Sequence, residues 1–243
     1  MTAFKFELAP LAKFDPAKIV SEQGNDRVAS FILSLALAFN DLKGLLLFRE
    51  ALLPAKPADQ SAIAPDSGEW AGISLQVHRL LVAHLHELLL LIKEFEDEAT
   101  GASIKAIMKR AARTVRDDWD ELVKIAVGKG ARSDTDFTRV LMLTRNNAVY
   151  HYNQPKPLVA GYRRHFFNNP PNPTNEHAYA SVGQNMERTR FYFADAAVQG
   201  ALENLLGAVD NEKFSNQAVR TIKAVNHALH FIVSGYIKRA KRV

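Results

Sequence analysis

Arg145, Asn146 and His151 stand within seven consecutive residues, shortly before Pro155. The guanidinium group of an arginine is permanently charged and donates hydrogen bonds in a planar fork that fits a phosphate group. Histidine is the side chain best suited to move a proton near neutral pH. Together these side chains are a minimum for cleaving a phosphodiester without a metal ion. They are equally compatible with a helix that ends in polar residues, so the surrounding sequence has to decide.

The elements that must position these residues are predicted to be helical, because apolar residues recur with helical spacing and no segment alternates as a strand would. We expect helices over residues 27–50, 69–98, 103–127, 134–153, 189–207 and 212–240, with Asp26 as the N-cap of the first and Trp119 on the inward side of the third. Residues 154–188 are rich in proline and asparagine and are predicted to form a long loop before the last two helices. The sequence therefore predicts an all-α antiparallel helical bundle in a single domain over residues 1–243.

Composition excludes several classes of protein. The chain contains no cysteine, which excludes disulfides, zinc–thiolate sites and a cysteine nucleophile and is compatible with a reducing cytoplasm. The most apolar run, residues 28–39, is shorter than the roughly twenty residues of a membrane span, and the N-terminus lacks the pattern of a secretory signal. We expect a cytoplasmic protein with no membrane partner. The net charge of +5 permits a polyanionic partner without requiring one.

The predicted fourth helix places its apolar residues on one face, which contains Phe137, Val140, Leu141, Thr144 and Ala148. Arg145 and His151 lie on either side of this face, roughly 120° apart on an ideal α-helix. The two side chains meet only if the helix loosens before Pro155, if the arginine reaches across, or if they meet the copies of a second subunit over a dimer axis.

The segment resembles the signature of the HEPN superfamily, in which an arginine is followed four to six residues later by a histidine. A polar residue, often asparagine, commonly follows the arginine directly, and Arg145, Asn146 and His151 match this pattern with a five-residue gap. The predicted all-helical architecture, with the motif towards the end of a late helix, extends the similarity to much of the chain.

The resemblance implies a homodimer whose paired motif helices form a composite cleft, and a metal-independent endoribonuclease of a toxin–antitoxin, defence or stress system. It implies that Arg145 holds the scissile phosphate, that His151 acts as general base or acid, and that Asn146 orients His151 or the phosphate. No cofactor is implied. The implied partners are RNA and an antitoxin or other regulatory protein. The predicted helices 27–50 and 69–98 are apolar beyond a single stripe, and a dimer interface would supply their second burial surface.

The alternative is a non-catalytic HEPN-like module that binds RNA or another protein. In that case Arg145 bridges a carboxylate, and His151 bonds a carbonyl group in the core. The candidate carboxylates are those of Asp117, Asp118 and Asp195.

Further candidates for contact with a substrate lie near the motif. Asn147 falls one turn before His151, and Tyr152 falls on the side of Arg145. Residues 161–167 interleave aromatic residues with Arg163 and Arg164, side chains that can stack on bases and grip phosphates. This part of the predicted loop is either a lid over the cleft or a segment anchored on the bundle by its aromatic rings, and we favour the anchor.

The remaining polar residues favour structural roles. Three histidines on the predicted second helix, His78, His84 and His86, point in different directions, so we expect no metal site. His227 and His230 lack a third ligand. Asp41 interrupts an apolar helix and is predicted to pair with an arginine such as Arg145 or Arg79. We expect Arg190 and Asp195 not to share a face, and Phe191 and Phe193 to be core or interface residues.

Overall fold

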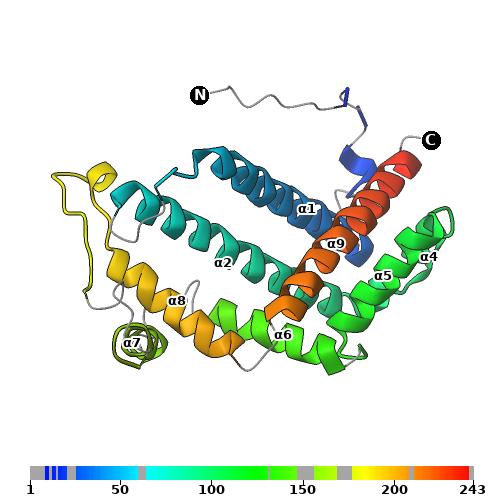
Figure 1. Cartoon of the computed structure of the whole chain (residues 1–243). Helices are drawn as coiled ribbons and strands as arrows, with labels where there is room; N and C mark the ends of the chain where they lie inside the picture. Colours follow the sequence, from blue (N-terminus) through cyan, green and yellow to red (C-terminus); the bar gives the residue numbers. More distant parts are fainter. Residues whose placement is uncertain are drawn as a thin grey trace. The chain divides into compact units, whose positions relative to one another are not determined.

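The computed structural model describes residues 9–10, 13–14, 16–20, 26–59, 64–130, 132–146, 156–168, 177–207 and 211–240. The regular structure of these residues is helical, apart from one isolated bridge between Ser181 and Arg190. The prediction of an all-α fold is therefore confirmed (Figure 1). The helices are α1 (Arg27–Leu52), α2 (Pro65–Glu94), α3 (Glu96–Ala99), α4 (Ala102–Met108), α5 (Arg113–Ala126), α6 (Arg132–Thr144), α7 (Lys156–Arg163), α8 (Tyr192–Leu206) and α9 (Asn211–Ala240).

Short helical turns adjoin several of these elements. Three are of the 3-10 type: η1 (Pro16–Lys18), η2 (Leu53–Ala55) and η6 (Met186–Arg188). The fourth, η4 (Arg164–Asn168), is a wider π-helix that continues α7 directly. The chain thus stays helical from the start of α7 to the end of η4, and its pitch changes between the two elements.

The chain divides into two compact units, each assembled from segments that are distant in sequence. The first unit comprises residues 1–43, 87–131 and 219–243, and the second comprises residues 44–86 and 132–218. Three long helices, α1, α2 and α9, therefore each contribute residues to both units. The single domain expected over residues 1–243 stays a prediction.

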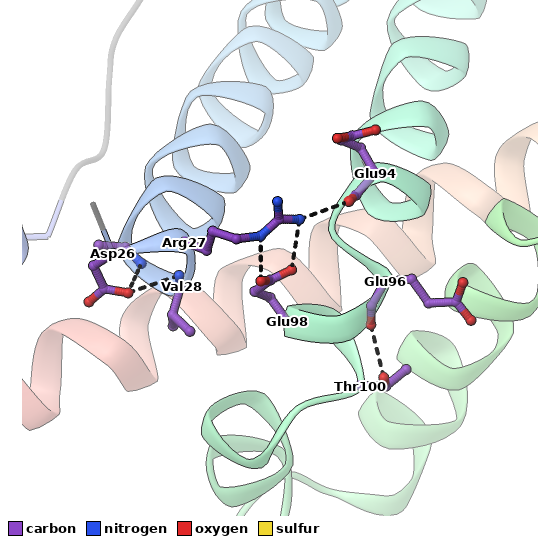
Figure 2. Close-up of polar contacts among 8 residues, drawn as sticks. Asp26, Arg27, Val28, Glu94, Glu96, Glu98 and Thr100 are labelled. Carbon is purple, nitrogen blue, oxygen red and sulfur yellow. Dashed lines mark hydrogen bonds and ion pairs between the residues drawn. The ribbon is translucent and has the colours of Figure 1, made fainter. Parts of the chain in front are cut away.

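The start of α1 is fixed by polar contacts within the first unit (Figure 2). The Oδ1 atom of Asp26 accepts hydrogen bonds from the backbone amides of Val28 at 2.9 Å and Ala29 at 3.2 Å, which confirms the predicted N-cap. The guanidinium group of Arg27 donates to both carboxylate oxygens of Glu98, at 2.6 and 3.3 Å, and to the carbonyl oxygen of Glu94 at 3.2 Å. These bonds tie the first turn of α1 to the last turn of α2 and to α3.

An aromatic cluster lies next to these polar contacts. The rings of Phe31 and Phe95 stack with their centroids 5.3 Å apart, and the ring of Trp119 lies 6.4 Å from that of Phe31. Trp119 faces inward, as predicted, and its Nε1 donates to the carbonyl oxygen of Ala99 at 3.3 Å. The guanidinium group of Arg27 lies 5.0 Å from the centroid of the Phe95 ring. The cluster therefore joins α1, the α2–α3 junction and α5 in one buried contact.

Two predicted helices are divided in the structure. The helix expected over residues 69–98 begins earlier, at Pro65, and breaks at Phe95, whose backbone leaves the helical region (φ −106°, ψ 34°). The helix expected over residues 103–127 divides into α4 and α5, because Ala112 adopts an extended ψ of 153°. The guanidinium group of Arg116 accompanies this break by donating to the carbonyl oxygen of Ala111 at 2.8 Å.

The segment predicted as a loop, residues 154–188, forms α7 and η4 over part of its length. Its prolines were interpreted as helix breakers, but Pro157 occupies the first turn of α7. A proline is tolerated there, because the amide hydrogen that it lacks has no helical acceptor in the first turn. Residues 177–185 contain no helix, so the prediction holds for that stretch.

Two helices are long and apolar enough to cross a membrane by length and composition alone. Residues 27–55 reach a mean hydropathy of 1.7, and α2 reaches 1.3. A core helix of a soluble protein passes the same test. Charged side chains at mid-helix, such as Asp41 and Lys43 of α1, are costly in hydrocarbon, by about 2.5–3.5 kcal/mol each at the centre of a bilayer. The cytoplasmic location and the absence of a membrane partner stay predictions.

Replacing Phe31 with alanine is expected to lower the free energy of unfolding by about 3–5 kcal/mol, because a fully buried ring that contacts two aromatic partners is lost. Urea unfolding followed by circular dichroism measures this change. Val219→Ala of α9 is the control. Since the Val219 side chain is 52% exposed, we expect a change within about 0.5 kcal/mol. Equal effects of the two substitutions would contradict the packing described for Phe31.

The pH dependence of stability tests the contact between Arg27 and Glu98. The hydrogen bond from Arg27 lowers the pKa of Glu98, and this effect outweighs the opposing effect of burial. The pKa is thus lower in the folded than in the unfolded chain, where it is about 4.3. The stabilisation is present above the unfolded-state value and is lost as the pH falls through the folded-state value.

Glu98→Gln is therefore expected to be less stable than the wild type at pH 7 and to approach it as the pH falls through the folded-state pKa of Glu98. Melting temperatures measured from pH 7 to pH 2.5 check this convergence. Asp120→Asn removes an exposed carboxylate of α5 that forms no ion pair among the described residues, and it should leave the pH profile unchanged. A constant difference between Glu98→Gln and the wild type over the whole pH range would be evidence against the linkage.

Candidate functional site

The α6 helix presents the apolar face that the sequence predicts. Phe137, Val140, Leu141 and Thr144 are all buried, each with at most 4% of its surface exposed. This confirms the predicted face for the described residues. Ala148, the fifth predicted member, lies outside them. The burial of Thr144 fixes the position of the residue that follows it, Arg145, at the edge of the buried face.

The helix widens directly after Thr144. Arg145 and Asn146 adopt a π-helical turn, and both side chains are half-buried. The Nη1 atom of Arg145 donates to the Oδ1 atom of Asn146 at 3.1 Å. The Asn146 amide therefore orients the guanidinium group. The predicted angle of 120° between Arg145 and His151 assumed an ideal α-helix, and a π-helical turn departs from that geometry.

The predicted site residues fall into two groups. Arg145 and Asn146 lie together, and Arg163 and Arg164 lie at the junction of α7 and η4. Three others, Asn147, His151 and Tyr152, lie outside the described residues. The pairing of Arg145 with His151 therefore stays a prediction.

The α7 helix is seated on α8 by direct contact between the two backbones, and both helices belong to the second unit (Figure 1). A Cβ atom added to Gly161 would collide with the carbonyl oxygen of Ala197, and one added to Gly200 would collide with the carbonyl oxygen of Gly161. Only glycines permit this approach. Arg163 and Arg164 follow Gly161 within one helical turn. The crossing therefore fixes the position of their backbone relative to α8.

The η4 turn presents charged and aromatic side chains together. The Nε atom of Arg164 is buried and has no hydrogen-bond partner among the described residues. Buried polar atoms are normally satisfied, so an oxygen acceptor from a ligand would complete this group. The centroids of the Tyr162 and Phe166 rings lie 4.6 Å apart, and both side chains are half-buried. Phe167 is 73% exposed. The expected anchoring fits Tyr162 and Phe166, whereas Phe167 is free to contact a partner.

One signal in the sequence was overlooked. No carboxylate occurs from residue 137 to residue 175, a stretch that we call the basic segment. Its cations are Arg139, Arg145, Lys156, Arg163 and Arg164. Residues 99–116, with five cations, and residues 213–243, with seven, also contain no carboxylate, so the positive charge of the chain is not confined to the basic segment. The basic segment is the positive stretch that carries every predicted site residue.

The carboxylates considered as partners for Arg145 are engaged elsewhere. Asp117 lies 3.7 Å from Arg113, Asp118 lies 3.1 Å from His227, and Asp195 lies 2.9 Å from Arg190. The contact of Asp118 also agrees with the structural role expected for His227. Asp41 is exposed on α1. These pairings weaken the interpretation of Arg145 as one half of a structural ion pair with Asp117, Asp118 or Asp195.

The prediction that Arg190 and Asp195 do not share a face was wrong. Arg190 precedes α8, where its backbone pairs with that of Ser181, so helical spacing does not apply to it. Its guanidinium group contacts Asp195 at 2.9 Å and Glu69 at 3.1 Å. Burial alone would lower the pKa of Arg190, but the two carboxylates outweigh it and raise the pKa. Arg190 therefore joins α2 to α8 within the second unit.

Other predictions concern histidines and phenylalanines. Among the described residues, no group of three histidine, aspartate or glutamate side chains could hold a metal ion. The Nδ1 atom of His78 lies 2.7 Å from the carbonyl oxygen of Ser74, one turn earlier in α2. This contact agrees with the structural role expected for His78. Phe191 and Phe193 are 52% and 39% exposed, so they are not core residues, and the alternative of an interface stays a prediction. Both residues flank the start of α8, where their rings contact each other rather than the interior.

Gly161→Ala tests the crossing of α7 and α8. The added methyl group would meet backbone atoms that cannot rotate away, so we expect a loss of at least about 1–3 kcal/mol in the free energy of unfolding. Gly44→Ala is the control, because nothing lies within 4 Å of its Cβ position in α1. Alanine favours a helix over glycine, so this variant should gain about 0.5–1 kcal/mol. The two changes are measured by chemical unfolding, and equal signs would contradict the close crossing.

Comparison with known proteins gives no match. No family model, curated protein or solved structure matches this chain. A functional assignment therefore depends on the residues of the chain itself, above all on Arg145, Asn146 and the arginines of the basic segment.

Proposed function

We propose that this protein is a HEPN-like, metal-independent endoribonuclease, which binds RNA at the basic segment and cleaves it with Arg145 and His151. One observation carries the proposal. Within the described residues, the two π-helical turns occur at Arg145–Asn146 and at η4, and both lie in the basic segment. Such turns are rare and appear frequently at functional sites. The first turn coincides with two residues of the sequence motif, and the second includes Arg164, which the sequence predicts as a substrate contact.

The proposed chemistry is an internal transesterification. His151 removes the proton from a 2′-hydroxyl group, and the 2′-oxygen attacks the adjacent phosphorus atom. The bond from phosphorus to the 5′-oxygen breaks, and a protonated histidine supplies the proton that this leaving group needs. The products are a 2′,3′-cyclic phosphate and a 5′-hydroxyl end.

Arg145 stabilises the charge that develops on the phosphate in this reaction. The guanidinium group is half-buried and held by Asn146, so little reorganisation is needed when the substrate binds. Partial burial also strengthens its attraction to an anion, because fewer water molecules compete for the group. In the proposal, Asn146 is thus a positioning residue for Arg145.

Binding of RNA is supported by the second half of the basic segment. Arg163 and Arg164 supply positive charge, and Arg164 has a buried nitrogen atom that lacks a partner among the described residues. The exposed ring of Phe167 offers a surface on which an unpaired base can stack. No carboxylate of this segment would repel the phosphate backbone.

The proposal includes a homodimer in which each subunit contributes to a composite cleft. Large apolar side chains are exposed along α1, including Leu33 at 49%, Leu37 at 62% and Phe48 at 52%. Such residues on one helix support a second burial surface of the kind that a dimer interface provides. Cellular control by an antitoxin or another regulatory protein belongs to the same proposal.

The test is RNA cleavage in the presence of EDTA. Purified full-length protein should cut a structured RNA and leave 2′,3′-cyclic phosphate ends, which are identified by mass spectrometry. Arg145→Ala and His151→Ala should each reduce the rate at least about 100-fold, the usual range for removing a charge-stabilising group or a general base. Asn146→Ala should have a smaller effect.

Arg113→Ala is the matched control, because Arg113 lies on α5 outside the basic segment, is exposed and pairs with Asp117 at 3.7 Å. Its rate should stay near that of the wild type. Binding of RNA without cleavage by the wild type would favour the non-catalytic module. Full activity in both Arg145→Ala and His151→Ala would exclude the proposed mechanism.

A further inference from the structure

The first unit contains a groove between α4 and α9, which belongs to neither the motif nor the basic segment. The two helices run antiparallel, since Arg239 contacts Ser103 at one end and Gly235 contacts Ile107 further along. A Cβ atom added to Gly235 would lie 2.6 Å from the Cγ2 atom of Ile107. The close approach at this glycine forms the floor of the groove.

The groove has an apolar middle and positive ends. Its cavity measures about 250 Å³ and is lined by Ile107, Phe231 and Gly235 in the middle, with Ser234 beside them. Arg110 lies at one end, level with Phe231, and Lys238 and Arg239 lie at the other. Lys238 follows Phe231 by seven positions in α9, which corresponds to roughly 10 Å along the helix.

The positive charges of the groove are not neutralised within the described residues. The side chains of Arg110 and Lys238 form no hydrogen bond or ion pair with other described residues, and the guanidinium group of Arg239 makes one long bond, 3.5 Å, to the carbonyl oxygen of Ser103. No carboxylate lines the cavity. The two ends of the groove therefore attract anionic groups. The apolar floor between them disfavours a ligand that is polar along its whole length, because its polar groups would lose their hydration there.

We propose that this groove binds an elongated small molecule with an anionic group at each end and an apolar middle. The ends carry carboxylate or phosphate groups, which pair with Arg110 on one side and with Lys238 and Arg239 on the other. The middle covers Ile107 and Phe231. A single-headed lipid would leave one cationic end without an anion, and an RNA strand would place polar groups over the apolar floor. The site is independent of the proposed ribonuclease activity.

Octanedioate is the probe, because its two carboxylates lie about 9 Å apart when extended, close to the length of the groove. Titration calorimetry with the full-length protein should detect binding of octanedioate at least about 10-fold tighter than binding of octanoate or butanedioate. Octanoate lacks the second charge, and butanedioate is too short to reach both ends. Equal binding of octanoate would instead indicate a lipid-like ligand and would overturn the proposal.

Variants at the two ends separate the groove from general charge attraction. Arg110→Gln and Lys238→Gln should each weaken octanedioate binding to the level of octanoate. Lys105→Gln and Lys109→Gln remove the same charge from exposed positions of α4 or its end, outside the groove, and should leave the affinity unchanged. Ser234→Leu keeps the charge but fills the cavity and should abolish binding.

Circular dichroism verifies that each variant is folded before titration. Loss of affinity in all four charge variants alike would show non-specific attraction and overturn the proposal. The proposal also fails if octanedioate shows no binding to the folded wild type at 10 mM, about ten times the concentration that half-saturates a millimolar site.

Discussion

The second unit depends on one steric constraint, the contact between the backbones of α7 and α8 at Gly161 and Gly200. Each glycine lies where any larger residue would collide with a carbonyl oxygen of the facing helix. Packing at this distance leaves little freedom for one helix to shift along the other. Arg163 and Arg164 follow Gly161 within one turn, so their backbone is fixed by the same contact. A site built on α7 is therefore held by a helix and not by a loop, which favours a defined geometry for binding an anion.

The polar and apolar contacts of the first unit contribute unequally to its stability. Arg27 donates to both carboxylate oxygens of Glu98, but its side chain is 55% exposed, and exposed ion pairs contribute little to stability because water screens them. The neighbouring rings of Phe31, Phe95 and Trp119 exclude water from the same junction. Burial of these rings therefore contributes more to the stability of this junction than the ion pair does. The bond from Arg27 to Glu98 sets which turn of α1 lies beside α3. The charge thus gives specificity to a contact that the aromatic side chains stabilise.

Sequence reasoning predicted the elements whose signal is local. The N-cap at Asp26, the inward side of Trp119 and the buried face of α6 all follow from capping chemistry or helical spacing. It failed where tertiary contact overrides local preference. The prolines and asparagines of residues 154–188 suggested a loop, yet Pro157 occupies the first turn of α7, and Gly161 permits the crossing of α7 onto α8. The ion pair of Arg190 with Asp195 was missed, because the prediction applied helical spacing to both residues. Arg190 lies before the first residue of α8, so that spacing does not apply to it.

The candidate site was predictable in its residues and not in its backbone. The motif identified Arg145 and Asn146, but spacing alone does not reveal that the helix widens there or that Asn146 holds the guanidinium group. A second π-helical turn follows at Arg164, in the same carboxylate-free segment. This turn leaves a buried arginine nitrogen without a hydrogen-bond partner in the described part of the chain. Because buried polar atoms are normally satisfied, an anionic ligand that completes this group is the simplest account of it, and neither the turn nor the unpaired nitrogen follows from residue spacing.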